Sequence, residues 1–152
     1  MIKGLFESHL PVSNLEKSIV FYEKLGLELE SIIPKKVAFF WIEKNKSWLG
    51  LWETDVSQYP YHPAIRHVAF EVTLEDLRKS ISWLKERQIT TREAFGFEGT
   101  EPFVSPHEDK AYAKIHFYDL DGNSLEFITE LKNPKHLHKK MYLSDCLEIN
   151  QM

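Results

Sequence analysis

The chain has 152 residues, a mass of 17.9 kDa and a net charge of −4, with 19 Lys and Arg against 23 Asp and Glu. This length suits one domain, the 43% hydrophobic residues are typical of a globular protein, and the acidic balance argues against nucleic acid as a partner. The longest apolar run, residues 37–42, is too short to span a membrane, and the N-terminus lacks the apolar core of a signal peptide. We therefore expect a cytoplasmic protein with no membrane partner. The single cysteine, Cys146, excludes an internal disulfide and a zinc site built from cysteines.

The first half of the chain begins with a predicted strand that contains His9, in the sequence Glu-Ser-His-Leu-Pro-Val. Ser13 and Glu16 have the spacing of a capping box, and the apolar residues that follow recur at helical spacing until Gly26, which predicts a helix. Three short strands are then predicted at Glu28–Ile33, 37–42 and 48–52.

The second half repeats this order. A strand with His67, in Arg-His-Val-Ala-Phe-Glu-Val, precedes a helix that Thr73 and Asp76 would cap. Strands are predicted at 89–92, 111–118 and 124–129, and the last two are joined by the turn sequence Asp-Leu-Asp-Gly-Asn. The half is longer than the first because of residues 93–110, which are rich in Gly, Pro and acidic residues. We expect this segment to form a flap, because long connections in compact domains are usually functional.

Each half thus reads strand, helix, strand, strand, strand, with a histidine on the first strand of each half and Glu126 on the final strand. With the segments His-Leu-Pro-Val-Ser-Asn-Leu-Glu-Lys-Ser-Ile-Val-Phe-Tyr, Arg-His-Val-Ala-Phe-Glu-Val and Asp-Leu-Asp-Gly-Asn-Ser-Leu-Glu-Phe, this order resembles the vicinal oxygen chelate superfamily. That group includes glyoxalase I, extradiol dioxygenases, fosfomycin-resistance enzymes and bleomycin-binding proteins.

The resemblance implies an α+β fold, in which two tandem βαβββ modules form an open, curled mixed β-sheet half-barrel around a metal cavity. We expect a single domain over residues 1–131, with module one at about 4–56 and module two at about 64–131. Residues 132–152 are expected to be a polar C-terminal tail, whose segments around Met141 and Cys146 are candidates for contact with a partner subunit. Superfamily members often pair between chains, so a homodimer is expected, and the sequence leaves open whether the modules pair within or between chains.

His9, His67 and Glu126 are the predicted metal ligands. Side chains on a strand alternate between its two faces, so each of the three can point to the same side as its neighbours two residues away. Two imidazoles and one carboxylate with open positions suit one divalent ion, which can be Fe, Mn, Ni or Zn. A small-molecule substrate could then chelate the ion through two neighbouring oxygens.

At three positions, the residue differs from the one that particular branches of the superfamily usually have. Gly50 stands where glyoxalase I carries a fourth, acidic or amide ligand, which counts against lactoylglutathione chemistry. Fosfomycin-resistance enzymes also lack that ligand and carry an aromatic residue that Trp48 matches, but they usually have Thr where this chain has Pro11. They and the extradiol dioxygenases commonly have Tyr at the position of His116.

His116 is the predicted catalytic acid or base, because a histidine titrates near neutral pH; the alternative is a structural hydrogen bond to a neighbouring strand. Lys114 and Tyr118 share its strand face, and Lys114 could bind an anion. Trp48 and Trp52 flank Gly50 and indicate an apolar or aromatic substrate. The predicted substrate-binding residues are therefore Trp48, Gly50, Trp52, Lys114 and Tyr118.

The function predicted first is a glyoxalase-like, metal-dependent lyase or isomerase acting on a small substrate that chelates the metal through vicinal oxygens. Ring-opening oxygenation of the extradiol type and thiol transfer of the fosfomycin-resistance type are the enzymatic alternatives. A drug-binding protein without catalysis, similar to the bleomycin-resistance members, is the rival from another class; those members generally lack the ligand triad.

Overall fold

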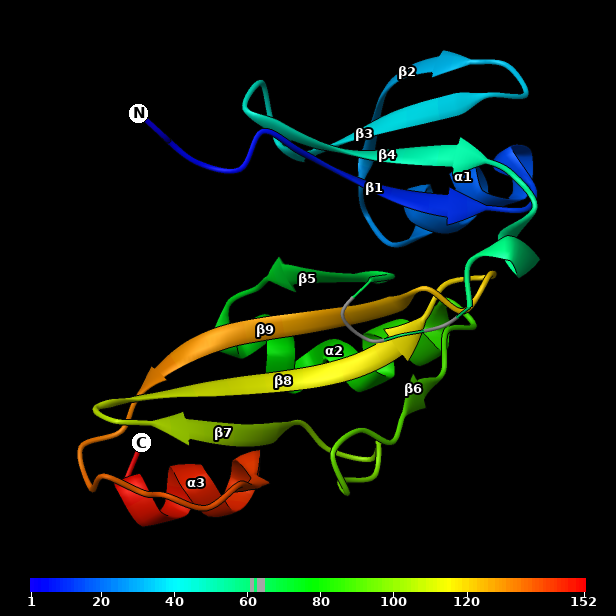
Figure 1. Ribbon diagram of the computed structural model, residues 1–152. Helices are drawn as coiled ribbons and strands as arrows, with labels where there is room; N and C mark the ends of the chain where they lie inside the picture. Colours follow the sequence, from blue (N-terminus) through cyan, green and yellow to red (C-terminus); the bar gives the residue numbers. More distant parts are fainter. Residues whose placement is uncertain (61, 63–64) are drawn as a thin grey trace. The chain divides into compact units, whose positions relative to one another are not determined.

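The computed structural model describes residues 1–60, 62 and 65–152 (Figure 1). The fold is α+β, with sheets that are mixed and not closed into a barrel, as predicted. In chain order, the elements are β1 (Glu7–Val12), α1 (Leu15–Lys24), β2 (Glu28–Ile33), β3 (Val37–Glu43), β4 (Ser47–Glu53), the 3-10 helix η1 (Val56–Gln58), β5 (His67–Glu71), α2 (Leu74–Glu86), β6 (Thr91–Arg92), β7 (Phe103–His107), β8 (Lys110–Tyr118), β9 (Ser124–Lys132), β10 (Met141–Tyr142) and α3 (Leu143–Asn150).

The chain divides into two compact units. The first comprises Met1–Val68 together with Tyr118–Ser124, and the second comprises Ala69–Phe117 with Leu125–Met152. The turn between β8 and β9 therefore belongs to the first unit, although its flanking strands lie mostly in the second. Within the described residues, no helix has the length and apolar character that a membrane crossing requires.

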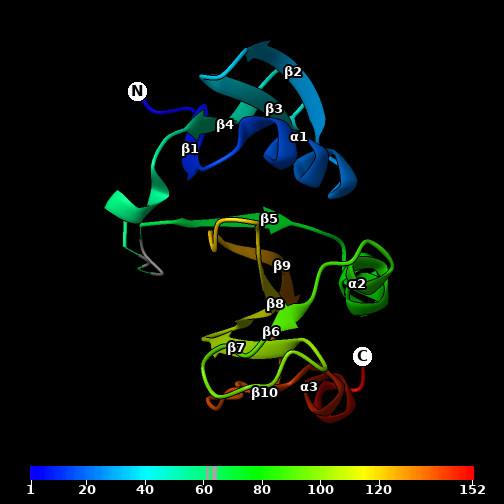
Figure 2. The same ribbon diagram turned by 90° about the vertical axis from the view of Figure 1, so that its right-hand side faces the viewer.

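The sheet of the first unit has the strand order β1-β4-β3-β2, with β1 parallel to β4 and the other pairs antiparallel. Helix α1 packs on this sheet (Figure 2). The ring of Tyr22 on α1 lies 6.0 Å from that of Phe40 on β3, and Leu49 and Leu51 on β4 are fully buried with them. Because strand side chains alternate, the residues between these core positions lie on the opposite face of the sheet.

The start of α1 differs from the sequence prediction. The N-cap is Asn14, whose side chain accepts a hydrogen bond from the backbone N–H of Lys17 at 3.0 Å. The N–H of Leu15 donates to a carboxylate oxygen of Glu53 at 2.8 Å, so a side chain from β4 satisfies the donor that lies just inside the helix. Asn is an equally good N-cap residue, and the distant acceptor could not be read from local spacing.

The second unit contains most of a sheet with the strand order β10-β7-β8-β9-β5, on which β6 also pairs with β8. The predicted cap of α2 is confirmed: the Thr73 hydroxyl accepts a hydrogen bond from the Asp76 N–H at 3.1 Å. Leu77 and Leu84 of the helix are fully buried, and the rings of Phe117 and Phe127 meet at 5.0 Å within this core.

Residues 93–110 and 132–152, predicted to be a flap and a polar tail, contain regular structure that the sequence analysis did not predict. Strand β7 takes up residues 103–107 and pairs along β8, so this part of the long connection is a sheet strand. Strand β10 pairs in turn with β7, and α3 follows it with Leu143, Cys146 and Leu147 buried in the same unit. Leu143, Cys146 and Leu147, from the segments proposed to meet a partner subunit, are thus buried within this chain.

Candidate metal and substrate site

Neighbouring strands of the first unit bring His9 and the tryptophans onto one face of the sheet. The register pairs His9 with Gly50 and Gly50 with Phe39, while Trp48 pairs with Trp41. These positions alternate with the core residues that contact α1, so they lie on the opposite face. We call this surface the aromatic face; it consists of His9, Phe39, Trp41, Trp48 and Trp52.

The rings of the aromatic face form a continuous series of contacts. Trp48 lies 5.3 Å from Trp41 and 5.6 Å from Phe39, measured between ring centroids. His9 in turn lies 6.2 Å from Phe39 and 6.0 Å from Trp52, with both contacts edge to face. Such pairs stabilise each other and present flat apolar surface, which is the property expected of a wall that binds an apolar or aromatic group.

Gly50 is required by the position of the His9 ring. A Cβ atom added at residue 50 would lie 2.3 Å from Nδ1 of His9 and 3.2 Å from the Phe39 ring. The imidazole therefore occupies the space above Gly50 that a side chain would need. A fourth ligand cannot be placed at this position without moving His9, so the predicted departure from glyoxalase I has a steric basis.

Both ring nitrogens of His9 have neighbours. The indole N–H of Trp52 donates a hydrogen bond to Nδ1 at 2.9 Å, and Nε2 lies 3.4 Å from a carboxylate oxygen of Glu7. The other oxygen of Glu7 accepts a hydrogen bond from the Trp48 indole at 2.7 Å. This bond, with a smaller contribution from His9, lowers the pKa of the Glu7 carboxyl, so the group is ionised at neutral pH.

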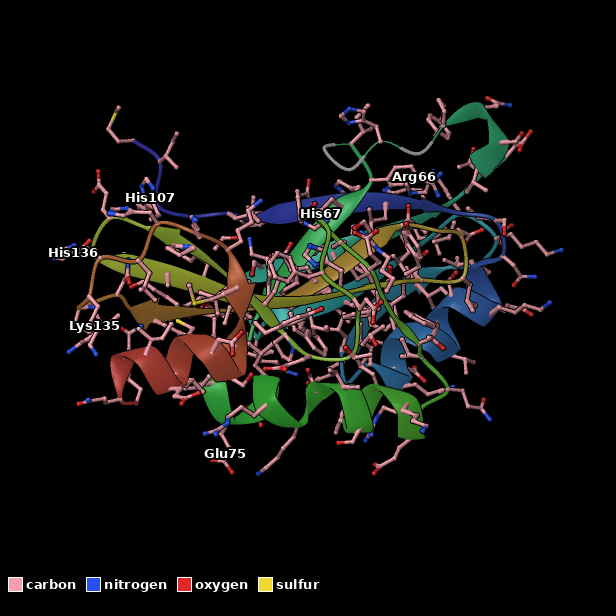
Figure 3. All side chains as sticks on the ribbon, turned by 90° about the horizontal axis from the view of Figure 1, so that it is seen from below. Arg66, His67, Glu75, His107, Lys135 and His136 are labelled. Atoms are coloured by element: carbon pink, nitrogen blue, oxygen red, sulfur yellow. The ribbon has the colours of Figure 1, made fainter. Side chains whose placement is uncertain are left out.

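His67, the second predicted ligand, stands at the start of β5 and is half-buried (Figure 3). Its Nδ1 lies 3.2 Å from the hydroxyl oxygen of Ser124. The neighbouring residue, Arg66, accepts a backbone hydrogen bond from the Ser124 N–H at 2.8 Å. The strand that carries His67 is therefore held to the end of the turn between β8 and β9.

That turn contains a buried polar cluster that the sequence analysis did not find. Asn123 is fully buried; its amide donates to the backbone carbonyl of Pro11 at 2.9 Å and to Asp119 at 2.7 Å. Its side-chain oxygen accepts from Nε of Arg66 at 2.8 Å. Asp119 also accepts from the hydroxyl of Tyr22 at 2.8 Å, and burial raises the pKa of this carboxyl. The Asp-Leu-Asp-Gly-Asn motif was the available signal, but it indicated only a turn.

Glu126 and His116, which belong to the second unit, are in contact with each other. The carboxylate of Glu126 and Nε2 of His116 are 3.2 Å apart, and both side chains are almost completely buried. The His116 ring stacks on Phe103 at 5.8 Å, with an angle of 15° between the ring planes, and meets the edge of Phe95 at 5.9 Å. A charged carboxylate in such surroundings needs a polar partner, and the imidazole supplies one.

Lys114 and Tyr118 complete the predicted set. Lys114 is half-buried opposite Phe103 in the register of β7 and β8, and its ammonium lies 5.8 Å from the centre of that ring. Burial, opposed by the charge of Glu126, lowers the pKa of Lys114. Tyr118 falls in the segment assigned to the first unit and is 41% exposed.

The predicted triad thus draws His9 and His67 from the first unit and Glu126 from the second. Across residues 1–60, 62 and 65–152, no three His, Cys, Asp or Glu side chains are grouped closely enough to hold a metal ion. The assignment of the three ligands stays a prediction. Within each unit, the neighbours of each predicted ligand are defined: Trp52 and Glu7 for His9, Ser124 for His67, and His116 for Glu126.

Comparison with known proteins decides the family. Residues 5–127 match the family model described as the glyoxalase/bleomycin resistance protein/dioxygenase superfamily. The chain belongs to this superfamily. The matched range includes His9, His67 and Glu126, and it agrees with the resemblance seen in the sequence.

Two members of the superfamily are similar to this chain over most of its length. Metallothiol transferase FosB from Staphylococcus haemolyticus is 29% identical over 130 residues, which cover 85% of each chain. FosB from Shouchella clausii strain KSM-K16 is 26% identical over 148 residues, covering 97% of this chain and 94% of that protein. These relatives are metallothiol transferases, so they correspond to the thiol-transfer alternative and not to the predicted lyase or isomerase.

Solved structures confirm the fold. An integron cassette protein from the mobile metagenome of the Halifax Harbour sewage outfall has a TM-score of 0.62 and 25% identity, covering 84% of this chain and 99% of that one. The fosfomycin resistance protein FosX from Listeria monocytogenes, solved with Mn(II) and sulfate, has a TM-score of 0.59 and 21% identity, with 99% of both chains covered.

Proposed function

We propose that this protein is a metal-dependent thiol transferase acting on a small molecule that binds a divalent metal ion through two neighbouring oxygens. The observation that carries the proposal is the similarity to metallothiol transferases over 85% of both chains. The presence of His9, His67 and Glu126 at the positions where the superfamily resemblance implies ligands supports it. The bound metal would polarise the chelated oxygen and stabilise negative charge that develops on it.

The donor set and its surroundings fit a divalent ion. Two imidazoles and a carboxylate suit Mn, Fe, Ni or Zn, and the ion's identity is left to experiment. Metal-binding side chains are usually oriented by hydrogen bonds to their other atoms. The contact of Glu126 with His116, and that of His67 with Ser124, are of this kind. His116 therefore suits a positioning role through Glu126 better than the direct acid or base role that the sequence suggested.

The reaction we propose is the addition of a thiol to an electrophilic carbon, as in the opening of an epoxide. The sulfur forms a bond to the carbon as the carbon–oxygen bond breaks, and the oxygen keeps the bonding electron pair. The thiol's proton ends on that oxygen, so no further reactant is needed. Lys114, half-buried and with a lowered pKa, would hold an anionic group of the substrate or the thiolate.

We propose that the substrate carries an apolar or aromatic portion, which binds to the aromatic face. Trp48 and Trp52 flank Gly50 there, and the ring of His9, which lies over Gly50, is in edge-to-face contact with Trp52. Pro11 and His116 replace residues usual in fosfomycin-resistance enzymes. Fosfomycin is therefore a reference compound for the assay and not the expected best substrate.

The isomerase or lyase prediction is less well supported. The lactoylglutathione lyase of Agrobacterium tumefaciens shares the fold, with a TM-score of 0.61, but only 18% of the sequence. Its branch is expected to use a ligand at the position of Gly50, where the His9 ring fills the space.

The test combines reconstitution with product analysis. Metal-free protein loaded with Mn²⁺ would be incubated with thiols and epoxides, including fosfomycin and aryl-substituted epoxides, and products identified by mass spectrometry. We expect adducts with the summed mass of thiol and epoxide, lost in His9→Ala and Glu126→Ala and retained in His107→Ala, a control that removes an exposed histidine from the end of β7. Isomerisation of the methylglyoxal–glutathione hemithioacetal without any adduct would overturn the proposal in favour of the lyase branch.

We also propose that the protein is a homodimer, as the superfamily resemblance implies, and that it is cytoplasmic, as its composition indicates. Sedimentation equilibrium of the purified protein measures the mass of the assembly, and a mass near 17.9 kDa would contradict the homodimer.

A further inference from the structure

The hydrogen bonds of His9 define which ring nitrogen carries the proton. The indole N–H of Trp52 can only donate, so Nδ1 of His9, 2.9 Å away, must accept with its lone pair. The proton of the neutral imidazole is then on Nε2. That nitrogen lies 3.4 Å from a carboxylate oxygen of Glu7, which is a hydrogen-bond acceptor. Both neighbours therefore select the same tautomer.

This tautomer conflicts with metal binding at either nitrogen. Ligation through Nε2 needs the lone pair of Nε2, so the proton must move to Nδ1, where it would face the N–H of Trp52. Ligation through Nδ1 needs the lone pair that Trp52 already uses. In both cases the hydrogen bond from Trp52 must break before His9 can bind a metal ion.

We propose that Trp52 is a latch on His9: it holds the histidine in its metal-free tautomer and swings away when the metal binds. The inference rests on the proposed role of His9 as a ligand. Trp52 is 40% exposed near the end of β4, so its indole has room to move without opening the core. Gly50, next to His9, provides the space in which the imidazole lies in the latched position.

The latch makes metal loading weaker than the ligands alone would give. A single hydrogen bond of this kind corresponds to a change of about three- to tenfold in an equilibrium constant. Trp52→Phe keeps an aromatic ring and removes the N–H, so it is expected to bind metal about three- to tenfold more tightly. Trp41→Phe is the matched control, because Trp41 lies on the same aromatic face but packs against Trp48.

The first measurement is the affinity for Zn²⁺, obtained by competition with a chromophoric chelator for the wild type, the two tryptophan variants and His9→Ala. We expect tighter binding in Trp52→Phe, wild-type binding in Trp41→Phe and loss of the site in His9→Ala. Equal affinities of wild type and Trp52→Phe, together with loss in His9→Ala, overturn the latch alone. A full-affinity site in His9→Ala, or no binding by any variant, overturns both the latch and the metal-site proposal.

The second measurement is independent of affinity. Long-range ¹H–¹⁵N spectra of the imidazoles at pH 8 report which nitrogen of His9 is protonated in the metal-free protein. We expect Nε2, with the preference lost in Trp52→Phe. The indole N–H resonance of Trp52, assigned by its absence in Trp52→Phe, should shift on addition of diamagnetic Zn²⁺. A proton on Nδ1 in the metal-free wild type, or an unmoved Trp52 resonance in the loaded protein, refutes the latch.

Discussion

Replacement of Asn123 by Ala tests the buried cluster that joins two segments of the first unit, the strand with His9 and the residues just before His67. The amide of Asn123 bonds to Pro11, two residues from His9 on β1, and to Arg66, which directly precedes His67. A single side chain thus ties the segments that carry two of the three predicted ligands. The third bond of the amide, to Asp119, fixes the turn itself.

The expected loss in the free energy of unfolding follows from these three hydrogen bonds. Two of the three join Asn123 to charged groups, the guanidinium of Arg66 and the carboxyl of Asp119, and hydrogen bonds to charged groups contribute about 1.5–3 kcal/mol each. The bond to the Pro11 carbonyl contributes about 1 kcal/mol. Because such contributions are not additive, we expect the free energy of unfolding to fall by about 3–5 kcal/mol, against a usual total of about 5–15 kcal/mol.

Urea unfolding of Asn123→Ala, monitored by tryptophan fluorescence and circular dichroism, measures this loss in the free energy of unfolding. Asn123→Asp is the informative companion: it keeps the acceptor for Arg66 but turns the donor into an oxygen that faces the Asp119 carboxyl and the Pro11 carbonyl. We expect it to be at least as destabilising at neutral pH. A loss below about 1 kcal/mol in Asn123→Ala, with an unchanged urea slope, would refute the view that this cluster supports the fold.

Three further outcomes are expected. Burial raises the pKa of Tyr22 well above its ordinary value, so the folded state resists ionisation while the unfolded state does not. The free energy of unfolding should therefore fall as pH rises above about 10, and fall less in Tyr22→Phe; parallel urea curves against pH would contradict this. Gly50→Ala should lower the thermal midpoint, because overpacking against His9 costs about 1–3 kcal/mol and exceeds the roughly 0.4–1 kcal/mol gained by restricting the unfolded chain; a raised midpoint would show that His9 moves freely. His116→Phe should weaken Zn²⁺ binding about 10- to 100-fold by removing the partner of Glu126, and unchanged affinity in a calorimetric titration would exclude the positioning role.

Much of the fold could be predicted because it depends on local periodicity and an internal repeat. The strands with His9 and His67, both main helices and the hairpin before Glu126 follow from alternation, caps and turn residues. The strand at 103–107 was missed because Pro106 and the polar residues around it resemble a loop. Strand β8 was predicted, but its pairing with β7 is a tertiary contact that leaves no local signal in the sequence.

The neighbours of the candidate ligands could be predicted only in part. The tryptophans beside Gly50 were expected on one face, since strand alternation places them there. The hydrogen bond from Trp52 to His9 depends on the register between β1 and β4, and the contact of His116 with Glu126 depends on how β8 and β9 lie in their sheet. Spacing along the chain determines neither, so the sequence left both a catalytic role and a structural hydrogen bond open for His116.

Gly50 links the stability of the first unit to the chemistry of the protein. In a strand interior, a glycine usually weakens the sheet, so its presence needs a compensating reason. Here the reason is the His9 imidazole, which lies where any Cβ would be, 2.3 Å from Nδ1. A chain with a carboxylate or amide at this position must hold its first histidine differently, and would then have a group for moving protons on the substrate. This chain places aromatic rings around a glycine instead. In the reaction that we propose, the nucleophile arrives with a second substrate, as a thiol does, so an acidic or amide side chain at this position is not required.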